Sequence, residues 1–343
     1  MNKNLRYLWL VIAAVCIFFM GGKWNIPLAA WIGPVFAIRF YRESERAGWD
    51  FLLLWVAFAI PYIVAWDGAT VMSIIQPALG AAFFFVMTPI GLIPYVIDRL
   101  YYRRFGSPAW LTLIYPVAAT AVDFLSSSGS PFGTFGAAAY SQRGFPAVMQ
   151  IAAVAGLWGI AFFVSWIASL VNHLWESGFK FTRLSLTFAG ALALVFFLGL
   201  GRSLLPSPSA HSAQVAGFSL PAGKINETLE QFQAGDEAEI RRTAEELHAQ
   251  ELAQIRKMAS DGADIVVLQE GAGMGYSDQV EKLMADASAL AKEAGIYIVL
   301  PTFDFGKSPP ENVVRIIDPR GEVVLTHVKY GGNQFEGTLE GNR

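Results

Sequence analysis

The sequence has little charge and almost no cysteine. Only 15% of its 343 residues are Asp, Glu, Lys or Arg, whereas a soluble domain carries about a quarter. The single cysteine, Cys16, excludes a disulfide framework within one chain and a cysteine-rich metal site. The four histidines, His173, His211, His248 and His327, are scattered without the spacing of metal ligands. We therefore expect no metal ion and no other cofactor.

Apolar side chains are present in excess, at 54% of the total, which indicates a membrane solvent. The charges are unevenly distributed along the chain. Residues 1–211 contain 13 Lys and Arg against 7 Asp and Glu, whereas residues 212–343 contain 12 against 21. The net charges are +6 and −9, which predicts two differently solvated parts. Because the second part is acidic, this asymmetry gives no sign of a nucleic-acid partner.

Seven apolar runs in the first part are candidates for membrane spans, which need roughly 17–25 residues. They cover residues 5–22, 26–40, 51–66, 71–97, 109–125, 149–171 and 184–201. The second run is short and interrupted by Pro27 and Pro34, which is typical of a re-entrant or tilted segment. The first run lacks a small-residue cleavage site at its end, so we interpret it as an uncleaved span rather than a signal peptide.

The basic residues of the short connections predict the orientation. With a cytoplasmic N-terminus and seven crossings, ten Lys and Arg face inward and three face outward, which is the positive-inside pattern. The inner ten are Lys3, Arg6, Arg39, Arg42, Arg46, Arg99, Arg103, Arg104, Lys180 and Arg183, and the outer three are Lys23, Arg143 and Arg202. Everything after residue 201 is then expected on the outer face of the membrane.

A linker rich in Pro and Ser, residues 205–211, is expected to separate a membrane domain, residues 1–204, from residues 212–343, which read as an α/β domain. Strands are expected at residues 214–220, 263–269, 296–301, 312–317 and 322–329, and amphipathic helices at residues 240–259 and 279–294. Asp278 and Glu281 have capping-box spacing, and Gly295 marks the end of the second helix.

Three side chains of this part are candidate catalytic residues. Glu270 ends an apolar strand, and ligand sites in α/β folds favour the carboxyl ends of strands, where a carboxylate can act as a general base. Lys329 ends the last expected strand, and Glu336 follows it in a glycine-rich loop. Taken singly, each residue also fits a non-catalytic role, because acidic residues at strand ends often form salt bridges and lysines there are usually solvated.

Together these residues resemble a known pattern. The run GADIVVLQE, residues 262–270, is similar to the segment around the catalytic Glu of the nitrilase, or carbon–nitrogen hydrolase, superfamily. The run NVVRIIDPRGEVVLTHVK, residues 312–329, is similar to the strand pair that ends in that superfamily's catalytic Lys. The resemblance implies that residues 212–343 are the N-terminal half of a nitrilase-like α-β-β-α sandwich.

A multi-span region followed by such a domain resembles the apolipoprotein N-acyltransferase family. The run GAAAYSQ, residues 136–142, followed by Pro146, Gln150 and GLWGI at residues 156–160, is similar to that family's loop-and-helix segment. The resemblance implies a multi-pass enzyme of the bacterial cytoplasmic membrane, with its catalytic domain on the periplasmic side. Such an enzyme moves an acyl chain from a phospholipid, through a Cys thioester, to the N-terminal amine of a lipoprotein.

The resemblance also implies a role for each candidate residue. Glu270 would be the general base, Lys329 would stabilise the oxyanion, and Glu336 would match the family's supporting Glu, although it lies one position closer to the Lys than usual. The family's nucleophilic Cys follows the Lys, whereas Cys16 lies in the first apolar run. We therefore expect the 343 residues to be a fragment of a longer enzyme, inactive by itself.

Two other functions fit part of the pattern. A membrane-tethered carbon–nitrogen hydrolase would use the same Glu and Lys and pass the acyl group to water. A transporter or sensor with an outer binding domain would need ionisable side chains within the spans. The candidates Asp67, Asp98 and Asp123 stand at or near span ends, which favours an interfacial position. The partners that the family resemblance implies are a phospholipid acyl donor, a lipoprotein N-terminus and membrane lipids, and nucleic acid is not expected.

Overall fold

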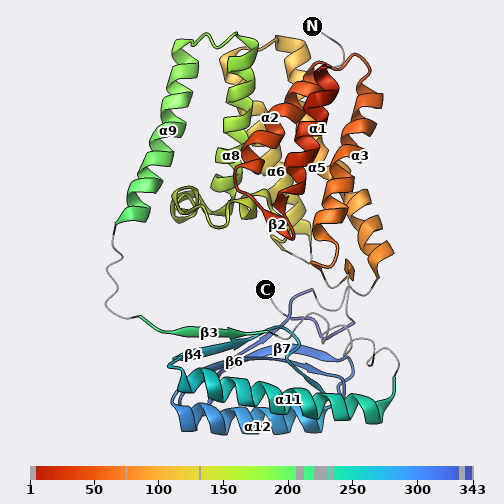
Figure 1. The fold of residues 1–343 in the computed structure, drawn as a ribbon, viewed down its shortest axis with the longest axis vertical. Coiled ribbons are helices and arrows are strands. Elements are labelled where there is room, and N and C mark those ends of the chain that lie inside the picture. Colours follow the sequence, from red (N-terminus) through yellow and green to blue (C-terminus); the bar gives the residue numbers. More distant parts are fainter. Residues whose placement is uncertain are drawn as a thin grey trace. The chain divides into compact units, whose positions relative to one another are not determined.

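The computed structural model describes residues 5–70, 72–73, 76–130, 133–205, 212–219, 231, 235–331 and 337–341. The chain divides into two compact units, Met1–Ser207 and Pro208–Arg343. We call them the membrane unit and the C-terminal unit, and describe each by itself (Figure 1).

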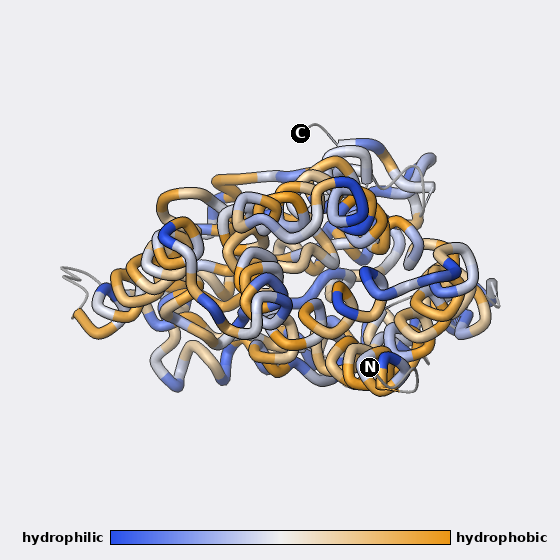
Figure 2. The backbone as a smooth tube through the Cα atoms, turned by 90° about the horizontal axis from the view of Figure 1, so that it is seen from above, coloured by the Kyte–Doolittle hydropathy of each residue, from blue (hydrophilic) through white to orange (hydrophobic). Residues whose placement is uncertain are grey.

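The membrane unit is a bundle of apolar helices, and in its described residues five helical stretches are long and apolar enough to cross a membrane. They are α3 (Ala47–Trp66), α5 (Pro77–Phe105), Ala109–Gly129 formed by η1 (Ala109–Leu113) and α6 (Ile114–Gly129), α8 (Ala152–Glu176) and α9 (Arg183–Leu204). These stretches are apolar by composition, and hydrophobic colours, with hydrophilic ones interspersed, are widespread in the view from above (Figure 2). Multiple crossings therefore fit the structure.

The first two apolar runs form helices of 14 residues each, α1 (Leu5–Phe18) and α2 (Ala29–Arg42), joined by the short hairpin of β1 (Met20–Gly21) and β2 (Trp24–Asn25). A straight helix of this length spans about 21 Å, less than the roughly 30 Å of a bilayer core. The expected count of seven crossings, and the orientation that depends on it, remain predictions.

Proline inside α5 is compensated by a neighbouring helix. Pro89 has no N–H, so the carbonyl of Phe85, four residues earlier, loses its helical partner. The indole Nε1 of Trp55 in α3 donates to this carbonyl at 2.8 Å. In hydrocarbon, where water cannot replace the missing donor, such a contact decides whether the proline is tolerated.

We expect Trp55→Phe to lower the stability of the membrane unit by about 1 kcal/mol, because it leaves the Phe85 carbonyl without a donor. The measurement is unfolding of the purified chain in detergent. Trp49→Phe is the control, since Trp49 is 59% exposed. Equal losses for both variants would contradict this reading.

The membrane unit holds a buried ion-pair cluster near the ends of three helices. Arg42, in the last turn of α2, donates to both carboxylate oxygens of Asp98 in α5 at 2.7 Å each. It also contacts Glu176, the last residue of α8, at 3.2 Å. Both Arg42 and Asp98 are almost fully buried, at 3% and 1% exposure. Since these groups lie near helix ends and are paired, they tie helices together and give no support to an ion path through the bundle.

The C-terminal unit is a mixed sheet with two helices on one face (Figure 1). Its main strand order is β3-β4-β6-β7-β8. The strands are β3 (Val215–Phe218), β4 (Ile265–Leu268), β5 (Gly273–Gly275), β6 (Tyr297–Asp304), β7 (Glu311–Ile317) and β8 (Val323–Val328). The pairs β3–β4, β4–β6 and β5–β6 are parallel, and the pairs β6–β7 and β7–β8 are antiparallel. The covering helices are α11 (Glu237–Ser260) and α12 (Ser277–Ala294), which pack over Val266, Ile298 and Leu300.

Two local details differ from the sequence-based expectations. The helix expected from residue 279 begins at Ser277, so Asp278 is inside its first turn and pairs with Arg241 at 2.9 Å instead of forming a capping box with Glu281. Strand β5 was not expected, because the run Gly-Met-Gly has no strand pattern. Glycine suits the close approach of this strand to its neighbours, because a Cβ at Gly273 would lie 2.8 Å from the Leu283 side chain and 3.2 Å from the Pro301 carbonyl.

Candidate active site

Glu270 projects from the point where the chain briefly leaves β6. Strand β4 pairs with β6 as far as Val267, opposite Val299, and β5 rejoins it with Gly273 opposite Thr302. The chain therefore advances six residues, from Val267 to Gly273, while β6 advances three, from Val299 to Thr302. The additional residues form a loop. Gly271 in this loop has φ +77°, a left-handed conformation that favours glycine. The loop carries Glu270 beyond the carboxyl end of a parallel strand, as the sequence indicated.

The structure brings the first two candidate residues together. Lys329, just after β8, places its Nζ 2.6 Å from Oε1 of Glu270. The Glu270 side chain is 62% exposed and the Lys329 side chain 35%. Within the described part of the chain, no residue donates to the second carboxylate oxygen, Oε2. As far as the described residues go, the Oε2 atom of Glu270 is thus open to an incoming group.

Asn312 is a third member that the sequence reasoning did not single out. Its side-chain Nδ2 donates to Oε1 of Glu270 at 2.9 Å, and its backbone carbonyl accepts the N–H of Lys329 at 2.9 Å. It is 6% exposed, so it is a buried polar side chain near the start of β7. The run that resembled the superfamily begins at this residue, but a lone Asn at a strand start has no distinctive pattern.

The electrostatics of the site favour the ionised carboxylate. Partial burial by itself raises the pKa of Glu270, but the hydrogen bonds from Lys329 and Asn312 and the Lys329 charge outweigh it and hold the pKa below its ordinary value. Glu270 is therefore ready to accept a proton at neutral pH. Because its side chain is largely exposed, the ion pair adds little to stability.

The backbone of Lys329 is held by the segment that follows. The N–H of Gly341 donates to the Lys329 carbonyl at 3.0 Å, and a side chain at Gly341 would lie 2.0 Å from the carbonyl of Val328. Glu336, the remaining candidate, lies outside the described residues. Cys16 is in α1 of the membrane unit.

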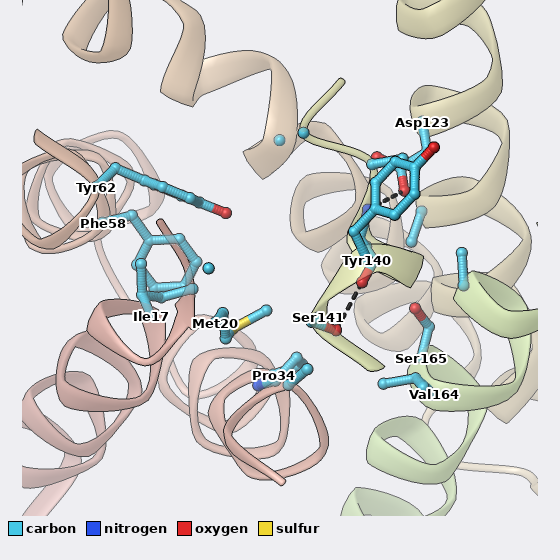
Figure 3. A pocket seen from close by; sticks show the side chains of 18 of the residues that line it. Ile17, Met20, Pro34, Phe58, Tyr62, Asp123, Tyr140, Ser141, Val164 and Ser165 are labelled. Carbon is cyan, nitrogen blue, oxygen red and sulfur yellow. Dashed lines mark hydrogen bonds between the residues drawn. The ribbon is translucent and has the colours of Figure 1, made fainter. Parts of the chain in front are cut away.

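The run 136–142 lies against a cavity of about 700 Å³ within the membrane unit (Figure 3). The short helix η2 (Ala138–Gln142) is fixed there by polar side chains: Asp123 accepts the N–H of Ala138 at 3.0 Å, and Asn25 donates to the carbonyl of Ser141 at 3.0 Å. The rest of the lining is mostly apolar, with Ile17, Met20, Pro34, Phe58 and Val164 among it. The cavity therefore combines an apolar wall with a polar one.

These features define a multi-span membrane protein with a mixed α/β C-terminal unit and a Glu–Lys–Asn constellation at a strand end. The chain is similar to apolipoprotein N-acyltransferase of Haemophilus influenzae, with 25% identity over 241 residues. The matched part covers 67% of this chain and 44% of that protein, so the chain spans less than half of the relative that it matches. No protein-family model matches the chain. The similarity supports a distant relationship to an acyltransferase.

Proposed function

We propose that the chain is the membrane part and the opening portion of the catalytic domain of an N-acyltransferase of lipoprotein maturation. The enzyme moves an acyl chain from a phospholipid, through a Cys thioester, to the N-terminal amine of a lipoprotein. The observation that carries the proposal is the 2.6 Å contact between Glu270 and Lys329, with one carboxylate oxygen left open. The distant similarity to an enzyme of this name supports the same activity.

The proposed chemistry uses Glu270 twice as a base. Its carboxylate takes the proton of a thiol while the sulfur attacks the ester carbonyl of the phospholipid. The Lys329 ammonium stabilises the oxyanion of the tetrahedral intermediate. The intermediate expels the lysophospholipid alkoxide, which recovers the proton from Glu270. In the second half, Glu270 takes a proton from the attacking amine and returns it to the leaving sulfur.

This mechanism needs a thiol beside Glu270. The only cysteine of the 343 residues is Cys16, which α1 of the membrane unit carries. Within the proposal, the nucleophilic thiol comes from a polypeptide segment other than the 343 residues, and Glu336 remains the candidate supporting Glu. The 343-residue chain by itself is expected to form no acyl-enzyme.

The proposal includes a nitrilase-like sandwich, of which the C-terminal unit would be one half. Its support is the sheet face turned away from α11 and α12. Val215, Tyr297 and Leu325 lie on this face and are 62%, 42% and 47% exposed. An apolar sheet face of this kind is normally packed against a second layer. A second sheet would provide that cover.

Acyl transfer can be measured directly in membranes that contain the natural gene product with these residues. A phospholipid labelled in its sn-1 chain and a diacylglyceryl peptide are supplied, and the products are analysed by mass spectrometry. The proposal predicts that the label appears on the N-terminal amine of the peptide. Release of the label as free fatty acid alone would favour the hydrolase, which the same Glu–Lys pair serves. No movement of label by the folded protein would refute both.

Topology provides a second test. The ten-to-three distribution of basic residues supports the proposal that the C-terminal unit lies on the periplasmic side of a bacterial cytoplasmic membrane. A reporter that is active only in the oxidising, external compartment is expected to be active when it is fused at Ser209. Activity of a cytoplasmic reporter at Ser209 would overturn the orientation, and a fusion at Gly106, after α5, is the companion measurement for the opposite face.

A further inference from the structure

The imidazole of His248 reaches from α11 to the strand that follows Glu270. Its Nε2 lies 2.8 Å from the carbonyl oxygen of Met274 in β5, and the residue is 8% exposed. Because a carbonyl only accepts, Nε2 carries the proton of this bond. Burial lowers the pKa of His248, outweighing the opposing effect of the Met274 carbonyl, so the ring is neutral at ordinary pH. The histidine therefore acts as a fixed donor.

The bond adds a tie from α11 to a short strand. Strand β5 is three residues long and, within the described ranges, pairs with β6 alone. Two of its three residues are glycines, so it has almost no side chains to pack. Gly275 has the His248 ring beside it, 3.5 Å from where a side chain would begin. The His248 N–H from α11 thus pairs with a β5 carbonyl that a neighbouring strand would otherwise pair with.

Strand β5 lies in one row of the sheet with the residues that hold Glu270. Met274 is opposite Phe303 in β6, and Phe303 is opposite Asn312 in β7. The carbonyl of Asn312 then accepts the N–H of Lys329. His248 stands at one end of this row and Lys329 at the other. Glu270, only four positions before Met274, bends back to contact both Asn312 and Lys329.

We propose that His248 is a positioning residue: by fixing β5 to α11, it holds the loop after β4 so that Glu270 stays within hydrogen-bond reach of Asn312 and Lys329. The importance for catalysis rests on the proposed function. The positioning itself concerns contacts within this chain and can be tested without an acyl-transfer assay.

The test compares variants of the full chain in detergent with two readouts. Hydrogen exchange of the amides of residues 271–275 reports the attachment of β5, and carbon NMR of labelled Glu side chains, assigned with Glu270→Gln, reports the titration of Glu270. His248→Leu introduces an apolar side chain of similar size and removes the N–H donor. We expect exchange to become at least about tenfold faster, and the Glu270 pKa to return to its ordinary range. A general packing role would change the first readout and leave the second unchanged.

Two further variants complete the design. His248→Gln retains an N–H donor and is expected to keep both readouts close to those of the unchanged chain. His327→Ala, which removes an exposed imidazole from β8, is the control and should change neither. The proposal is overturned if His248→Leu leaves the Glu270 titration unchanged. It is equally overturned if His248→Leu unfolds the unit, seen as lost protection in α12, because the residue would then be a general core residue.

The outcome is separable from the fate of the proposed function. Faster exchange and a shifted Glu270 titration, in a protein that transfers no acyl chain, would retain His248 as the positioning residue of a site with another activity. If acyl transfer is observed, His248→Leu is expected to lower kcat with KM unchanged, because the variant displaces the base and changes no other described contact of Glu270 or Lys329.

Discussion

Glu270→Gln is expected to lower the proposed acyl transfer about 10²–10³-fold, with folding and membrane insertion unchanged. The amide oxygen of Gln can still accept from Lys329 and Asn312, so the local geometry is retained. It cannot take a proton from a thiol or an amine. Lys329→Met, which removes the cation beside the oxyanion, is expected to reduce turnover by a similar factor.

Turnover of sn-1-labelled phospholipid is the measurement for both variants. Glu322→Gln and Lys282→Met are matched controls, because they remove one acidic and one basic group at exposures of 66% and 77%. Near-normal turnover by either site variant would refute the role given to that residue. The lowered pKa of Glu270 adds a second check: a base of this kind stays ionised as pH falls until the pH passes below the ordinary Glu range.

Glu251→Gln is expected to stabilise the C-terminal unit strongly at neutral pH and not at all in acid. Glu251 lies in α11 with no exposed surface, and among the described residues neither carboxyl oxygen has a hydrogen-bond partner. Burial raises its pKa from 4.5 to about 9. The folded state therefore keeps a proton that the unfolded state releases, and between these two values stability falls by about 1.4 kcal/mol per pH unit.

The sign follows from this proton count. Below pH 4.5 the Glu251 carboxyl is protonated in both the folded and the unfolded protein, so the buried group does not reduce the free energy of unfolding. As pH rises towards 9, the unfolded protein releases this proton, and the free energy of unfolding falls. From about pH 4.5 to 7.5 the unchanged protein should lose ~4 kcal/mol through this group, and Gln, which is neutral throughout, should lose none of it. Urea unfolding of the full chain, followed by proteolysis of the C-terminal unit, measures the difference. Glu246→Gln, at 64% exposure, is the control, and a wild-type unit equally stable at both pH values would contradict the expectation.

Local pattern was sufficient for most secondary structure. The strands expected at residues 312–317 and 322–329 form β7 and β8, because two runs rich in β-branched residues on either side of the turn Asp318-Pro-Arg-Gly already predict a hairpin. Gly295 ends α12 in a left-handed conformation, as a helix-terminating glycine does. Apolar composition likewise identified the helical runs of the membrane unit. In hydrocarbon the backbone N–H and C=O groups must be paired within the segment, and a continuous apolar helix pairs them.

The candidate site was only partly accessible from the sequence. Glu270 and Lys329 could be singled out because each ends a strand, and their likeness to a known pattern paired them. Asn312 could not, since its role depends on a neighbour 42 positions away. The same holds for His248, whose bond to Met274 joins a helix to a strand with no recognisable pattern.

The sequence by itself therefore indicated two parts of different composition, most helices and strands, and the two charged residues that meet at the candidate site. Only the tertiary structure decided which polar groups meet across the fold: Arg42 with Asp98, Trp55 with the Phe85 carbonyl, and His248 with the Met274 carbonyl. The physical reason is range. Periodicity and turn chemistry act over a few residues, whereas a buried donor must find its acceptor wherever packing places it, and an unpaired one is costly.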